Sequence, residues 1–189
     1  MKQVVLSEDE KDVLQELMNV AYGNATAVVA EMLDAFATLS IPKIKVIKTS
    51  ELLKEFGNKK ESSYFFSTQA FIGEFSGESA FFINDKSAKN LAKHLEIDED
   101  DDLSDAILEL TNVLTSSLTT RLAQEMDTQV SYSLPSISKV PLSEIEHVKT
   151  FKQYSQVIVI ETELNFQDQS IKGDIFILTK DGSIEWLKK

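Results

Sequence analysis

The sequence carries one long-spaced string twice, in the same register. The string is an aspartate, then a glutamate, an asparagine and a distant proline: Asp12-x3-Glu16-x2-Asn19-x22-Pro42 and Asp105-x3-Glu109-x2-Asn112-x22-Pro135. Every matched residue is displaced by 93 positions. The same displacement aligns residues 41–44 with 134–137, and after a three-residue insertion residues 77–78 align with 173–174. The two copies predict an internal duplication, with repeats of about residues 8–97 and 103–189.

Two repeats of this length favour one pseudo-symmetric domain over a solenoid, because solenoids stack several shorter units. We expect residues 1–189 to form a single domain whose halves each run through a long helix, a strand, a short helix, two strands and a final helix. The expected fold class is α+β, with about six strands in a mostly antiparallel sheet packed against two long helices. A pseudo-twofold axis is expected to relate the two halves.

Local patterns place these elements along the chain. Ser7 and Glu10 form a capping-box pattern, which predicts a helix from near Glu8 to about residue 37. The second long helix is expected to start near Ser104. Runs of β-branched and aromatic residues predict strands at 41–47, 64–75, 78–83, 157–166 and 171–178. The phenylalanines of the first half are expected in the core: Phe65, Phe66, Phe71, Phe81 and Phe82.

Each long helix is expected to bury one face and to expose the repeated polar residues on the other. At about 100° per residue, the apolar positions form one stripe per helix: Leu14, Leu17, Met18, Ala21, Ala25, Val28 and Met32 in the first, and Ile107, Leu110, Leu114 and Leu118 in the second. Glu16 and Asn19 fall on the opposite side of the first helix, and Glu109 and Asn112 do so on the second. Core packing does not require an exposed Glu/Asn pair twice, so these are the candidate functional residues.

The overall charge and the absence of cysteine exclude several classes of function. The net charge is −12, from 31 acidic and 19 basic side chains, and no basic stripe is present to bind a phosphate backbone. A nucleic-acid partner is therefore not expected. The chain has no cysteine, which excludes disulfides, thiolate metal sites and thiol catalysis. No segment resembles a secretion signal or a membrane span, so we expect a cytoplasmic protein without a membrane partner.

The sequence also argues against a metal site. His94 and His147 have no further ligand at a useful spacing, which disfavours zinc. The acidic residues at 98, 100, 102 and 109 occupy the first, third, fifth and twelfth positions of a calcium-loop template. The turn position that requires glycine is Leu103, however, and we interpret residues 98–102 as a solvated acidic linker before the second long helix.

The repeated string resembles the signature of the CheC/CheX/FliY family of bacterial chemotaxis phosphatases. The segment Asn19-Val20-Ala21-Tyr22-Gly23-Asn24-Ala25 is also similar to a helix opening common in that family. The resemblance extends over nearly the whole chain through the repeat. Two intact motifs favour the CheC type over CheX, which resembles a one-motif chain that dimerises. The departures are Met18 and Thr111, where many relatives have glycine, and Ser116 in place of Gly23 in the second copy.

The resemblance implies hydrolysis of the aspartyl phosphate on a CheY-type response regulator. The implied catalytic residues are Glu16, Asn19, Glu109 and Asn112. An acyl phosphate needs a water molecule held in line rather than a strong nucleophile. A neutral carboxamide can hold that water, so the asparagines are predicted to position it, and the glutamates are predicted to pair with a lysine of the partner. Asp12 and Asp105 are predicted to be partner-binding residues at the interface.

Other functions stay compatible with the same residues. A non-catalytic adaptor would dock a receiver domain, or a CheD-type deamidase, without accelerating hydrolysis. A switch-complex component like FliY is a weaker alternative, because the chain lacks the extra domain associated with that role. We expect a monomer with two equivalent sites and no cofactor bound by this chain. Mg²⁺ is expected on the partner receiver domain.

Overall fold

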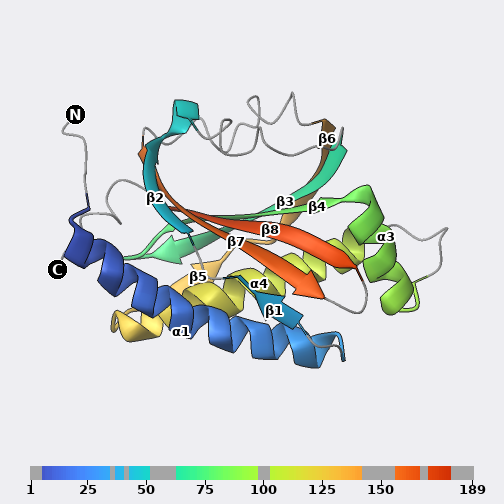
Figure 1. Ribbon diagram of the computed structural model, residues 1–189, viewed down its shortest axis with the longest axis horizontal. Helices are drawn as coiled ribbons and strands as arrows, with labels where there is room; N and C mark the ends of the chain where they lie inside the picture. Colours follow the sequence, from blue (N-terminus) through green and yellow to red (C-terminus); the bar gives the residue numbers. More distant parts are fainter. Residues whose placement is uncertain are drawn as a thin grey trace.

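The computed structural model describes residues 6–34, 37–40, 43–51, 63–97, 103–141, 156–166 and 170–179. Figure 1 shows a twisted sheet lying across two long helices, α1 (Glu8–Met32) and α4 (Ser104–Glu125), with the shorter α3 (Asp85–His94) at one end. The two long helices pack against each other and run in opposite directions beneath the sheet. This arrangement confirms the α+β class that the sequence predicts.

The described strands form one antiparallel sheet. They are β1 (Ala37–Leu39), β2 (Lys43–Lys48), β3 (Ser63–Gly73), β4 (Gly77–Asn84), β5 (Val130–Tyr132), β6 (Ser136–Pro141), β7 (Gln156–Phe166) and β8 (Ile171–Thr179). Their order is β1-β7-β8-β4-β3-β5, with β2 also paired to β7 and β6 also paired to β3. Over the described residues the sheet has eight strands: the six or so that the sequence predicts, and a three-residue strand, β1 or β5, after each long helix.

The strand pairing is two-fold symmetric in register. Ala37 of β1 lies opposite Phe166 of β7. The counterpart of Ala37 is Val130 of β5 and that of Phe166 is Gly73 of β3, each 93 positions away, and these two residues also lie opposite each other. The β2–β7 and β6–β3 registers are related by the same displacement. At the centre, Ala80 of β4 faces Phe176 of β8, its own counterpart after the three-residue insertion. We infer from this symmetry that the two halves are copies of one unit within a single domain.

Local capping signals set the start of α1 where the sequence predicts it. The Ser7 hydroxyl accepts from the Glu10 N–H at 3.2 Å, and the Glu10 carboxylate accepts from the Ser7 N–H at 2.6 Å. The C-terminus differs: the helix ends at Met32 rather than near residue 37. Asp34 there adopts a left-handed backbone with φ of 43°, a conformation that aspartate tolerates at a helix end and that stops the helix.

The core between the helices and the sheet agrees with the predicted stripe on α4 and only partly with that on α1. All four predicted α4 residues are buried. On α1, Val28 is 37 % exposed and Leu17 and Met32 are only partly buried, whereas Tyr22 and Val29 are buried instead. The buried face is centred on Met18, so the true stripe is rotated by roughly 50° from the predicted one.

Both faces of the sheet carry buried aromatic residues. Phe71 and Phe81 belong to the cluster that includes the apolar faces of α1 and α4. On the other face Phe82 contacts Phe66 and Phe176, with ring centroids 4.6 Å and 5.5 Å apart. The predicted core phenylalanines are therefore buried, except for Phe65, which is half-buried beneath the ammonium group of Lys139.

Several expectations from the sequence fall outside the described residues. These are Pro42, the acidic run 98–102, His147 and the final helix of the second half. Among the described helices, none is both long and apolar enough to cross a bilayer.

Two glycines make a matched pair for testing this packing. A Cβ on Gly77 would lie 2.0 Å from the Leu178 carbonyl oxygen and 2.8 Å from the Phe71 ring, whereas a Cβ on Gly23 would meet nothing within 4 Å. We expect Gly77→Ala to lower the free energy of unfolding by about 1–3 kcal/mol through overpacking. Gly23→Ala should raise it by about 0.5–1 kcal/mol through helix propensity. Denaturant unfolding measures both, and changes of the same sign would contradict the described packing.

A buried phenol in α1 provides a second test. The Tyr22 hydroxyl is buried without a hydrogen-bond partner among the described residues, and burial raises the pKa of Tyr22 well above its ordinary value. Removing an unpaired buried hydroxyl recovers its desolvation cost, so Tyr22→Phe should raise the free energy of unfolding by about 1 kcal/mol. The control is Tyr132→Phe, which removes a hydroxyl that contacts Thr120 at 2.6 Å and should be destabilising. Thermal unfolding of both variants checks the opposite signs.

Candidate functional site

The first repeated motif lies on the exposed side of α1, and we call Asp12, Glu16 and Asn19 the α1 ridge. All three side chains are exposed. Their spacings of four and three residues place them on one face of the helix, one turn apart. The Asn19 carboxamide oxygen accepts a hydrogen bond from Gln15 Nε2 at 3.3 Å, and Gln15 lies on the same helix. The ridge is thus open to a partner along its length.

The second motif forms a corresponding α4 ridge of Asp105, Glu109 and Asn112, also with three exposed side chains. Here the asparagine has a partner from the sheet. Asn112 Oδ1 accepts from Nε2 of Gln69 at 2.8 Å, and Gln69 lies on β3 with 2 % of its surface exposed. The same Nε2 donates to the Ser133 carbonyl oxygen at 2.9 Å. No local sequence signal marks Gln69, because the contact joins residues 43 positions apart.

A serine after each long helix ties the site region to the sheet in the same way in both halves. The Ser40 N–H donates to the Glu163 carbonyl at 2.9 Å, and the Ser40 hydroxyl accepts from the Glu163 N–H at 2.8 Å. Ser133 makes the same two bonds with Ala70, at 3.0 Å and 3.1 Å. Each serine precedes its motif proline by two residues, a repeated signal that could have identified them. We call this arrangement the serine clamp.

The carboxylates of the two ridges have no ion-pair partner in the part of the chain that the structure describes. The ion pairs there use other acids, for example Asp85 with Lys139 at 2.7 Å and Glu163 with Lys172 at 3.5 Å. Because the ridge carboxylates Asp12, Glu16, Asp105 and Glu109 are exposed and unpaired, they are available to a cationic group of another molecule.

Exposed apolar side chains lie beside the α1 ridge and beside the serine clamp of the second half. On α1, Val13 is 59 % exposed and Val20 is 45 % exposed, each directly beside a ridge residue. Leu134 follows the clamp residue Ser133 and is 91 % exposed. An exposed aliphatic group beside exposed acids is a combination typical of an interaction surface rather than of a purely solvated helix face.

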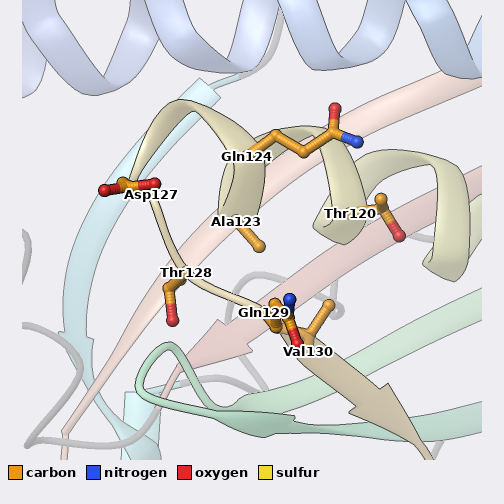
Figure 2. A pocket seen from close by; sticks show the side chains of 7 residues that line it. All are labelled: Thr120, Ala123, Gln124, Asp127, Thr128, Gln129 and Val130. Atoms are coloured by element: carbon orange, nitrogen blue, oxygen red, sulfur yellow. The ribbon is translucent and has the colours of Figure 1, made fainter.

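A separate hollow lies at the C-terminal end of α4 and contains no ridge residue. Figure 2 shows the residues that line it, which come from the end of the helix, the segment leading into β5 and the first residue of β5: Thr120, Ala123, Gln124, Asp127, Thr128, Gln129 and Val130. Among the described residues that line it, Asp127 is the only one with a carboxylate. Over the described ranges, no three histidine or acidic side chains are grouped closely enough to hold a metal ion. His94 contacts the Leu33 carbonyl through Nε2 and so links α3 to the end of α1.

Comparison with known proteins places this architecture in a functional family. The model of the family described as "Chemotaxis phosphatase CheX" matches residues 65–159, which is half of the chain. The CheY-P phosphatase CheC of Bacillus subtilis is 26 % identical over 206 residues, covering 96 % of this chain and 93 % of the relative.

Solved structures share the fold at lower sequence identity. FliY of Thermotoga maritima has a TM-score of 0.78 at 15 % identity, covering 98 % of this chain and 96 % of FliY. The middle domain of FliM from H. pylori has a TM-score of 0.64 at 15 % identity, covering 97 % and 99 %. The fold, the doubled motif and the family match agree, and the chain therefore belongs to the CheC/CheX/FliY family of chemotaxis phosphatases.

Proposed function

We propose that this protein hydrolyses the aspartyl phosphate of a phosphorylated CheY-type response regulator. The observation that carries the proposal is the pair of exposed ridges, each with a glutamate and an asparagine one helical turn apart. A relative that covers nearly the whole chain is named as a phosphatase of CheY-P. Each ridge provides polar groups that can enter a partner's pocket without rearrangement of the core.

The asparagines are the groups proposed to act on the reacting atoms. Hydrolysis of an acyl phosphate requires a water molecule in line with the scissile bond, and positioning supplies most of the acceleration. The carboxamides of Asn19 and Asn112 can accept a hydrogen bond from that water and donate one to a phosphoryl oxygen. A carboxylate in the same place would be repelled by the phosphoryl charge, which favours the neutral side chain.

The glutamates are proposed to dock the ridges. Glu16 and Glu109 are exposed and unpaired within the described residues, so pairing with a lysine of the receiver domain requires no internal ion pair to be broken. Asp12 and Asp105 lie one turn earlier and would extend the acidic contact. We propose that Mg²⁺ is provided by the acidic pocket of the partner rather than by this chain, and that one monomer presents both sites.

Docking without catalysis is the competing function. The shared fold includes FliM domains that were crystallised in complexes with SpeE and with FliG, so this architecture occurs in binding modules. An adaptor of this kind would hold the receiver domain, or a CheD-type deamidase, without stabilising the transition state. Binding of phosphorylated receiver with an unchanged phosphate half-life would favour the adaptor.

Removing both asparagines tests the catalytic proposal. We expect Asn19→Ala with Asn112→Ala to lower kcat/KM for receiver dephosphorylation at least 100-fold, because no group then holds the water. Each tenfold loss corresponds to about 1.4 kcal/mol of transition-state stabilisation. Each single variant should keep part of the activity. Phosphate release from a phosphorylated CheY-type protein measures the rates.

The control for this experiment is Asn24→Ala, an exposed asparagine of α1 outside the ridge. It should leave the rate unchanged. If the double variant turned over phosphorylated receiver as fast as the unmodified protein, the assignment of the asparagines would be wrong.

Reversing the glutamate charge tests the docking role. Glu16→Lys with Glu109→Lys should raise KM about tenfold or more and change kcat less, because an attractive contact with a lysine becomes repulsive. The control is Glu31→Lys on the same helix, an exposed glutamate beyond the ridge. A loss confined to kcat would place the glutamates in the chemical step instead of in docking. Steady-state kinetics at two salt concentrations separates the outcomes, since an exposed ionic contact weakens as salt is added.

A further inference from the structure

The two ridge asparagines are held differently. Asn112 is bonded through Oδ1 to a side chain that is almost fully buried in the sheet, whereas Asn19 is bonded to Gln15, a neighbour on its own helix. The position equivalent to Gln69 in the other half is Thr162, which has no carboxamide. The two sites are therefore not equivalent, although their ridge residues are the same.

The hydrogen bonds of Gln69 determine which end of its carboxamide faces α4. The Ser133 carbonyl can only accept, so the atom bonded to it at 2.9 Å is the Gln69 nitrogen. That nitrogen has a second hydrogen, and Asn112 Oδ1 accepts it at 2.8 Å. A reversed Asn112 would bring two amide donors together. The oxygen of Asn112 therefore turns toward the sheet, and its Nδ2 group turns away from Gln69.

The position of Gln69 is itself well fixed. It lies in β3 between the residues paired with β6 and those paired with β5. The next residue, Ala70, is hydrogen-bonded to Ser133 of the serine clamp. Its Oε1 is buried and has no hydrogen-bond partner within the described part of the chain. The carboxamide therefore keeps this place at a desolvation cost, unlike a freely rotating surface glutamine.

We infer that Gln69 is a positioning residue for the second site. It holds the Asn112 carboxamide with Nδ2 directed toward the phosphoryl group, while the remaining lone pair of Oδ1 stays available to water. The inference rests on the proposed function and extends it, because the second site then has a preorganised asparagine and works faster than the first.

The test measures each site separately in single-site backgrounds. In an Asn19→Ala background only the second site acts, and Gln69→Met should lower kcat about tenfold with KM changed less than twofold. In an Asn112→Ala background only the first site acts, and Gln69→Met should leave kcat within twofold. A general loss of folding would lower both rates, so the split between backgrounds identifies positioning.

Gln15→Met is the matched control, because it removes the corresponding donor to Asn19. It should change first-site kcat less than twofold, since Gln15 lies on a helix surface and its bond is long. Equal losses in both backgrounds, or no loss in the second site, would overturn the inference about Gln69. If the unmodified protein bound phosphorylated receiver and left its phosphate half-life unchanged, the proposed function would fail instead.

A measurement on the unmodified protein does not depend on catalysis. Side-chain ¹⁵N relaxation should give a higher order parameter for the Asn112 amide than for the Asn19 amide. The two signals are assigned by their loss in the Asn112→Ala and Asn19→Ala proteins. Equal mobility of the two amides would overturn the positioning role even if the protein proved to be a non-catalytic adaptor.

Discussion

The pairing of β4 with β8 is the interaction on which the rest of the structure depends. It joins the two halves through seven consecutive residue pairs, from Gly77 opposite Thr179 to Ile83 opposite Gly173. The strand registers are symmetric about this pairing, where Ala80 lies opposite Phe176. The edge strands of each half also pair with the other half, β1 and β2 with β7 and β5 and β6 with β3. Because each half contributes its own long helix to the same face of this shared sheet, α1 and α4 come together and each turns a ridge outward.

Much of this architecture could be predicted from the sequence, since it follows from local and periodic signals. The Ser7–Glu10 pattern identified the start of α1, and the repeat displacement carries through four strand pairings. Apolar spacing indicated which side of each helix is exposed, and the six ridge residues lie there. The assignment failed at Val28, because both Val28 and Val29 are apolar and only the packing against the sheet and α4 selects Val29.

The features that the sequence did not reveal depend on contacts between distant segments. In the sequence, Gln69 is one polar residue in a segment rich in aromatic residues, and only the fold brings it to Asn112. The two serines repeat at the expected displacement and could have been identified, but their hydrogen bonds to Glu163 and Ala70 follow only from the fold. Symmetry of the backbone therefore coexists with unequal side-chain support at the two asparagines.

The serine clamp has a further consequence for the outer margins of the sheet. Each margin consists of two short strands, β1 and β2 on one side and β5 and β6 on the other. Ser40 lies between the first two strands, and Ser133 lies between the other two. Exposed lysines also line β2 at positions 43, 45 and 48. An interrupted, charged margin is a poor template for adding a strand from another molecule, so the architecture resists self-polymerisation. A protein with long unpaired backbone at both sides would be prone to form fibres, and this chain presents none in its described strands.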